Sequence, residues 1–185
     1  MNKTKITMFV VLLFLFSIFF SFQTATQYKE VFVFVNDPVN VLPKIAQNYA
    51  VSNIVDYLKI KNVRAQADFP HSLESAFKVA REKDIPYLLE IRASLISMGR
   101  SENGYSVQLQ TSLAVYELSN FTPKLSSSAN ESSENSISSE IAFSYALYNG
   151  AIKAFHQIES SFFELIKRYS FKYFDKIEFD KIETD

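Results

Sequence analysis

The chain has two histidines, His71 and His156, and no cysteine. A zinc site needs several His, Cys or carboxylate ligands at close spacing, and neither histidine has a second one within a helical turn. Disulfides, thiolate metal sites and a thiol nucleophile are excluded because each requires cysteine. We therefore predict no catalytic or metal role for either histidine and expect packing or surface positions.

Glycine is also scarce: Gly99, Gly104 and Gly150 are the three in the sequence. Phosphate-binding loops need clustered glycines for close approach of the backbone, so P-loop and dinucleotide-binding motifs are excluded. No G-x-S-x-G motif of a hydrolase occurs either. The sequence thus predicts a protein that is not an enzyme and has no cofactor. Gly150 falls inside an expected helix, where it indicates a close contact between that helix and a sheet.

Four polar residues form the candidate partner-binding surface. Glu90 and Arg92 lie on one face of an expected strand, and Gln108 and Gln110 lie on the same face of the next strand. Such a face is either solvated or covered by a protein partner. Asp37 and the other strand-end aspartate, Asp68, are more simply explained as turn residues.

The elements that position these residues follow from hydrophobic periodicity. A continuous apolar run predicts a buried strand, and apolar residues at helical spacing predict two amphipathic helices, the second with Ser72 as its N-cap. A short strand is expected between the helices. In order, these elements are residues 31–35, 43–61, 62–66 and 73–83.

A long antiparallel hairpin is the clearest β signal. Apolar and polar residues alternate over Tyr87–Leu95 and again over Tyr105–Val115, with a Gly-bearing polar link between them. Residues 119–139 are rich in serine and are expected to be a flexible loop, although 121–125 could add a short strand. A long helix capped by Ser138 or Ser139 follows, and residues 171–185 are expected to be a C-terminal tail, either a strand or amphipathic.

The N-terminus has the order of a secretory signal. Lys3 and Lys5 precede an apolar run over Met8–Phe20, and small and polar residues follow. We predict that residues 1–26 are a signal peptide cleaved after Ala25. The alternative is an uncleaved anchor, in which residues 6–22 would cross the inner membrane. Either reading places the single domain, residues 27–170, in the periplasm or another extracytoplasmic compartment.

The overall charge is close to neutral, with 19 basic and 20 acidic residues. Binding to nucleic acid or to an anionic membrane surface needs a basic patch or stripe, so neither partner is expected. Apolar residues make up 48% of the sequence, which is enough for a sizeable core in one domain.

The hairpin region resembles known envelope proteins. The stretch from Ser75 to Leu95, followed by Gly104 to Asn120, is similar to the periplasmic domains of the CsgG and LpoB families and to the TolB N-terminal domain. This sequence departs from them at Glu90 and Asn120, where those families prefer glycine, and it lacks their lipoprotein cysteine. The resemblance implies a protein that binds partners, assembles pores or regulates envelope machines.

Together these features predict an α/β fold of order β-α-β-α-β-β-(β)-α, with a mixed sheet packed by about three helices. The expected function is an exported, non-enzymatic scaffold or regulatory module that binds other envelope proteins and could form a homo-oligomer. The alternative is a periplasmic binder of a small ligand or glycan. A hydrolase with an unrecognised site is the third reading.

Overall fold

The structure is a computed structural model that describes residues 29–70, 72–102 and 104–182, with side chains as far as Lys167 apart from Ser101. The predicted signal or anchor segment and His71 lie outside the described residues. The elements are β1 (Val31–Val35), α2 (Lys44–Ile60), β2 (Ala65–Ala67), α3 (Leu73–Glu82), β3 (Tyr87–Ser101), β4 (Gly104–Glu117), β5 (Leu125–Asn135) and α4 (Ser139–Ile182).

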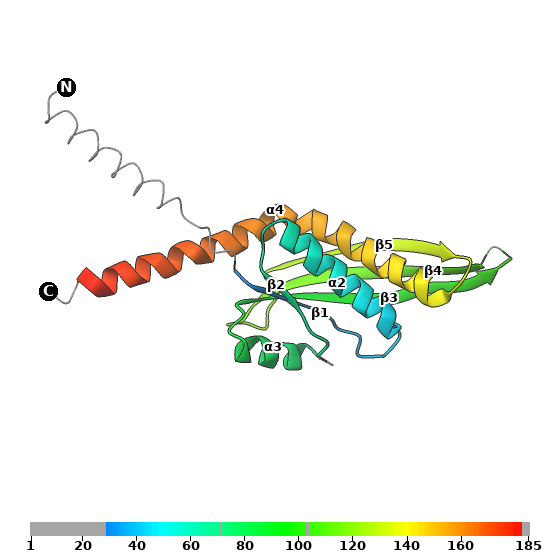
Figure 1. Cartoon of the computed structure of the whole chain (residues 1–185), viewed down its shortest axis with the longest axis horizontal. Coiled ribbons are helices and arrows are strands. Elements are labelled where there is room, and N and C mark those ends of the chain that lie inside the picture. The colour runs from blue at the N-terminus through cyan, green and yellow to red at the C-terminus, as the bar shows by residue number, and fades with distance from the viewer. Residues whose placement is uncertain (1–28, 71, 103, 183–185) are drawn as a thin grey trace, which may run out of the picture.

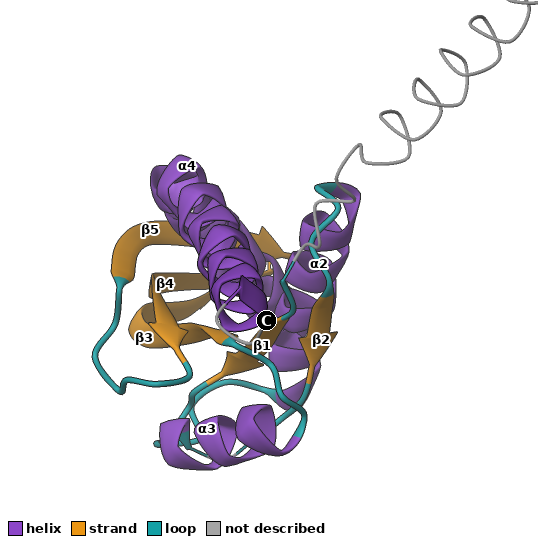
Figure 2. Cartoon of the chain, turned by 90° about the vertical axis from the view of Figure 1, so that its left-hand side faces the viewer, coloured by secondary structure: helices purple, strands orange, loops and turns teal. Residues whose placement is uncertain are grey.

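The five strands form one mixed sheet in the order β2-β1-β3-β4-β5. Strand β1 pairs in parallel with both β2 and β3, whereas β3, β4 and β5 form an antiparallel meander. Helices α2 and α4 cover one face of the sheet, and α3 lies on the opposite face (Figures 1 and 2). The predicted α/β class, mixed sheet and three helices are confirmed.

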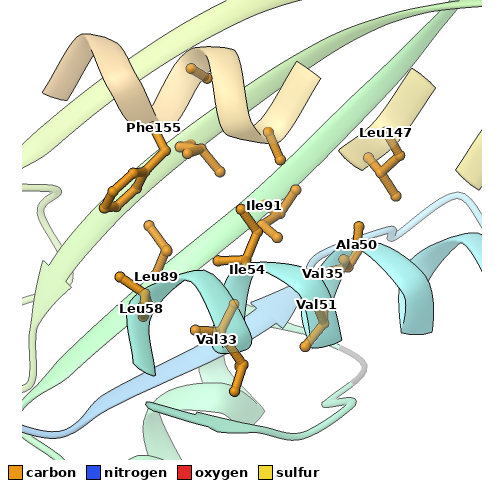
Figure 3. Close-up of a cluster of buried hydrophobic side chains, with 14 of the residues drawn as sticks. Val33, Val35, Ala50, Val51, Ile54, Leu58, Leu89, Ile91, Leu147 and Phe155 are labelled. Carbon is orange, nitrogen blue, oxygen red and sulfur yellow. The ribbon is translucent and has the colours of Figure 1, made fainter. Parts of the chain in front are cut away.

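The main core lies between the sheet and the pair α2 and α4. Side chains from β1 and β3 meet those of both helices there, as Figure 3 shows for Val33, Leu89, Ile54 and Phe155, all of them fully buried. A second, smaller cluster forms under α3, around Phe77. Because β1 faces a cluster on each side, its continuous apolar run is explained.

Helix ends and turns follow the local sequence. Ser72 caps α3 through a capping box in which its hydroxyl accepts from the Ser75 amide and the Ser75 hydroxyl accepts from the Ser72 amide. The Ser138 hydroxyl accepts a hydrogen bond from the Glu140 amide at the start of α4. The predicted helix at 43–61 is observed at Lys44–Ile60, and the short second strand begins three residues later than expected.

The prediction of a flexible loop at 119–139 is wrong. Residues 125–135 of that segment form β5, an eleven-residue strand that pairs with β4 along its length. Composition suggested disorder, but the serines and the other small or polar residues alternate between a half-buried face under α4 and an exposed face. For the tail at 171–185, the strand alternative is wrong, because the backbone of α4 continues as a helix to Ile182.

The close approach of α4 to the sheet explains the small residues of β5. A Cβ atom added to Gly150 would lie 2.5 Å from the Thr111 hydroxyl oxygen and 2.9 Å from its Cβ, so only glycine fits there. The Ser127 hydroxyl donates to the Ala154 carbonyl at 2.7 Å, and Lys153 pairs with Glu131. The predicted close contact at Gly150 is confirmed.

The sheet divides into two halves. The proximal half comprises β1, β2, residues 87–91 of β3 and residues 113–117 of β4, and it carries helices on both faces. The distal half comprises residues 92–101 of β3, residues 104–112 of β4, and β5. Figure 2 shows α4 on one side of the distal half and α3 displaced toward β1 on the other.

Candidate functional site

The structure separates the four predicted partner-binding residues into two groups. Glu90 is fully buried, whereas Arg92 and Gln110 are exposed and Gln108 is half-buried. The prediction that Glu90 lies on an accessible face is therefore wrong. Glu90 is on the expected face of the sheet. It lies in the proximal half, however, where Asn36, Arg92 and Tyr116 contact its carboxylate.

Glu90 is the centre of a buried polar cluster. Its carboxylate accepts hydrogen bonds from the Asn36 amide at 2.5 Å, the Tyr116 hydroxyl at 2.7 Å and the Arg92 guanidinium at 2.8 Å. Asn36 follows the last residue of β1, and Tyr116 lies near the end of β4. A buried carboxylate is costly unless it is paired and hydrogen-bonded, and here three donors meet that need, from β3, from β4 and from the residue after β1.

The cluster shifts the pKa values of Tyr116 and Arg92. Burial raises the pKa of Tyr116 to about 12, and the hydrogen bond to Glu90 adds to the effect. The hydrogen bond to Glu90 also raises the pKa of Arg92, whose side chain is half exposed. The phenol and the guanidinium stay protonated near neutral pH, so both remain hydrogen-bond donors and hold the strand ends together.

The exposed members belong to a wider surface, which we call the polar platform. It is the face of the distal half opposite α4, and the pairing of β3, β4 and β5 aligns its residues in rows. All are polar, and all but Gln108 and Ser112 are exposed. Its members are Arg92, Ser94, Gln108, Gln110, Ser112, Ser128, Asn130 and Ser132.

A shallow groove of about 630 Å³ lies on α3. Its apolar part is Phe77, which stacks on the exposed ring of Phe121 with centroids 4.1 Å apart. Charged residues of both signs line the rest, among them Glu74, Lys78 and Arg81. The groove therefore has an aromatic base and a mixed polar rim.

One spacing of possible catalytic meaning was missed in the sequence. Ser75 and Lys78 are three residues apart on α3, the Ser-x-x-Lys spacing of some acyl-transfer enzymes. The Ser75 hydroxyl, however, donates to the Ser72 carbonyl at 2.9 Å and accepts from the Ser72 amide at 3.0 Å. Its bonding is that of a helix cap, so the geometry accounts for Ser75 without a catalytic role.

His156 takes part in a second polar cluster, between α2 and α4. Glu159 accepts from the Tyr57 hydroxyl at 2.8 Å, lies 3.0 Å from the His156 Nδ1 atom and pairs with Lys61 at 3.4 Å. Burial raises the pKa of Glu159, but the hydrogen bonds from His156 and Tyr57 and the charge of Lys61 outweigh it and lower the pKa. The cluster joins the two helices at the surface.

Within the described part of the chain, no three His, Asp or Glu side chains are grouped to hold a metal ion. Over the same residues, no helix combines the length and hydrophobicity needed to cross a bilayer.

No protein-family model matches this sequence, and no curated protein does. Among solved structures, the chain is similar to the PelC dodecamer from Paraburkholderia phytofirmans, at 16% identity over 71% of this chain and 87% of that one, with a TM-score of 0.51. It is also similar to the lipoprotein GNA1162 from Neisseria meningitidis, at 7% identity over 63% and 91% of the two chains, with a TM-score of 0.41.

At such identities, the likeness to PelC shows the fold alone. The more specific resemblance to the CsgG, LpoB and TolB families stays a prediction. The described chain is thus an α/β domain of a fold shared with PelC, with a buried carboxylate cluster at its centre and a polar platform on its open face.

Proposed function

We propose that this protein is a non-enzymatic assembly module of the cell envelope, which recruits other envelope proteins through the polar platform. The observation that carries the proposal is the uncovered face of the distal half. Three long strands extend past α3 (Figure 1), and the face that α4 does not cover is polar.

The chemistry of the platform favours a protein partner. Serine, asparagine and glutamine side chains can donate and accept hydrogen bonds, and Arg92 adds one exposed guanidinium at the border with the proximal half. The mixed polarity, without a field of one sign, fits neither nucleic acid nor an anionic membrane.

Two further features support an envelope assembly. The order of the N-terminal sequence is that of a secretory signal, which would deliver the domain across the membrane. The PelC protein of similar fold was solved as a dodecamer, so this fold is compatible with building an assembly.

The test is site-specific photocrosslinking in intact cells, with the full chain carrying a photoreactive residue at Gln110. The control carries it at Asp56, an exposed residue of α2. We expect protein adducts at Gln110 that Asp56 does not give, and their loss when Ser128 and Asn130 are both changed to Lys. Identical adducts at the two positions, or adducts unaffected by the lysines, would contradict the proposal.

The second candidate function is a binder of a glycan or small ligand, because the α3 groove offers an exposed aromatic ring among polar groups. Sugars commonly stack on such rings. Titration of the full chain with cell-wall glycan fragments, followed by calorimetry, tests it. Heat that disappears in Phe121→Ala but persists in Phe69→Ala, another exposed phenylalanine, would support this candidate.

A further inference from the structure

Two long strand edges of the described sheet have no neighbouring strand, and both lie in the same part of the sheet. Strand β1 stops pairing with β3 at Ile91, so no strand of the described residues pairs with 92–100 of β3 on that side. On the opposite side of the sheet, β5 is the last described strand, and its partner there is β4. Both edges belong to the distal half, because the pairing places Ser94 level with Gln110 and Asn130.

The β5 edge lacks the features that protect a free edge. Natural proteins usually shorten such strands, interrupt them with proline or a bulge, or place lysine on them. Strand β5 has eleven residues, no proline, no lysine and a continuous register with β4. One backbone group of β5 already has a side-chain partner, because the Gln157 side chain donates a hydrogen bond to the Ser128 carbonyl at 3.2 Å. A long regular edge of this kind is a template for pairing with another strand.

The two edges complement each other in length and charge. Residues 92–100 of β3 carry Arg92 and Arg100 and no acidic residue, whereas β5 carries Glu131 and Glu134 and no basic residue. Arg92 is paired with Glu90 and Glu131 with Lys153 within the molecule, so the edges differ in sign mainly through Arg100 and Glu134. Both strands run in the same direction, because each is antiparallel to β4. The β5 edge of one molecule can therefore pair in parallel with the β3 edge of another.

We propose that copies of this chain associate head to tail through these edges, with β5 of one molecule extending the sheet of the next at residues 92–100 of β3. Such a contact uses two different surfaces of the same chain, so it repeats and forms a closed ring when the rotation between neighbours permits. Strand addition supplies main-chain hydrogen bonds to groups that are otherwise exposed to solvent.

The exposed apolar residues of the β3 edge fit this arrangement. Leu95, Ile96 and Met98 are 41%, 48% and 53% exposed, and they lie on a stretch of β3 that no helix covers. Leu95 and Met98 lie opposite Leu109 and Val107, the row that faces the helices. A neighbouring β5 would bring its own α4 to that side, so these side chains would be shielded from water.

Self-association does not rest on the proposed partner recruitment, because it uses strand edges and not the open face. The two proposals therefore fail separately. A chain that assembles but gives no platform adducts would refute only recruitment, and a monomer with platform adducts would refute only assembly.

Cysteine crosslinking tests the pairing directly, because the chain has no native cysteine. Ser97 and Ser132 are both level with Gln108, one on each side of β4. Within one molecule they are two strand spacings apart, roughly 9.5 Å, which is too far for a disulfide. The full-length double variant Ser97→Cys, Ser132→Cys, purified in detergent and treated with a mild thiol oxidant so that only disulfides form, should give a ladder of trimers and larger species.

The matched controls are the two single-cysteine variants, which can give at most dimers. A lysine on the β3 edge provides the second measurement. Met98→Lys should weaken association about tenfold, because a charge on an edge strand opposes pairing with another strand. Ile60→Lys, at an exposed position of α2, is the matched control and should leave association unchanged. A monomeric mass for the wild-type chain in native mass spectrometry, or a double-cysteine variant that stops at dimers, would overturn the proposal.

Discussion

The proximal and distal halves of the sheet use the same strands in different ways. In the proximal half, β3 is buried on both faces and even its one carboxylate, Glu90, is fully paired. In the distal half, the same strand is exposed from Arg92 to Arg100, apart from the half-buried Ala93. The contrast teaches that β3 contributes to the core only in the proximal half, whereas in the distal half it presents an edge and a polar face.

Two leucines of β3 provide the sharpest test of this contrast. Leu89 is fully buried in the main core, and Leu95 is 41% exposed on the same strand. We expect Leu89→Ala to lower the free energy of unfolding by about 3 kcal/mol and Leu95→Ala by less than about 1 kcal/mol. Urea denaturation measures both. Equal losses would show that the distal half contributes to stability as much as the proximal half.

Tyr116→Phe tests whether the buried cluster stabilises the proximal half. The change removes the hydrogen bond to Glu90 and should cost about 2 kcal/mol at neutral pH, because the acceptor is charged. The pKa of Tyr116 is raised to about 12 from an ordinary 10.0, so the protonated phenol stabilises the fold fully below pH 10. This contribution is lost as the pH rises through 12.

The measurement for Tyr116 is a series of urea midpoints between pH 7 and pH 12. The difference between wild type and Tyr116→Phe should stay constant up to about pH 10 and shrink above it. Tyr105→Phe is the control at pH 7, since Tyr105 lies on the distal half of the same strand, and it should cost less than Tyr116→Phe. A difference that grows above pH 10 would refute this role of the phenol.

Gly150→Ala probes the boundary between α4 and the sheet. Alanine favours a helix by about 1 kcal/mol over glycine, but its Cβ would overlap Thr111 and force α4 outward, at about 1–3 kcal/mol. Because the 2.9 Å contact is to the Thr111 Cβ, which cannot rotate away, we expect a net loss of about 1–2 kcal/mol. Asn149→Ala, at the exposed neighbouring position, is the control and should be neutral or slightly stabilising.

The smallest effect is expected at the surface cluster that joins α2 and α4. Glu159→Gln should cost less than about 1 kcal/mol at neutral pH, because the partners are only partly buried. The pKa of Glu159 is lowered, so its contribution is present above its ordinary value of 4.5 and is lost as the pH falls below that value. Thermal unfolding should therefore show a larger difference between wild type and variant at pH 7 than at pH 3.5.

The fold could be predicted largely from the sequence because its signals are local. Alternation over Tyr87–Leu95 and Tyr105–Val115 indicated the hairpin, Ser72 indicated a helix start, and Gly150 indicated a close contact. Strand β5 was missed because serine is polar and small, and composition alone does not show that α4 would need small residues on one face of a strand. The period-two burial of Ser127, Ala129 and Glu131 appears only once α4 is in place.

The candidate site was predicted less well, since its geometry depends on segments far apart in the sequence. Arg92, Gln108 and Gln110 do share one face, as alternation predicted. Glu90 shares it too, but Asn36 and Tyr116, which are 54 and 26 residues away along the chain, bring it into the interior. A carboxylate at a position where related patterns have glycine was the one available signal, and it pointed to a special environment without naming the partners.

The strand order also has a consequence for how the chain folds. The meander β3-β4-β5 joins neighbours in sequence, so it closes through short loops. Strand β1 must instead insert between β2 and β3, which lie about 30 and 50 residues further along the chain. Because closing long loops has the larger entropic cost, we expect the exposed meander to form first and the helix-covered core to be completed by the late arrival of β1. The half of the molecule that is least buried would then be the template on which the most buried half is built.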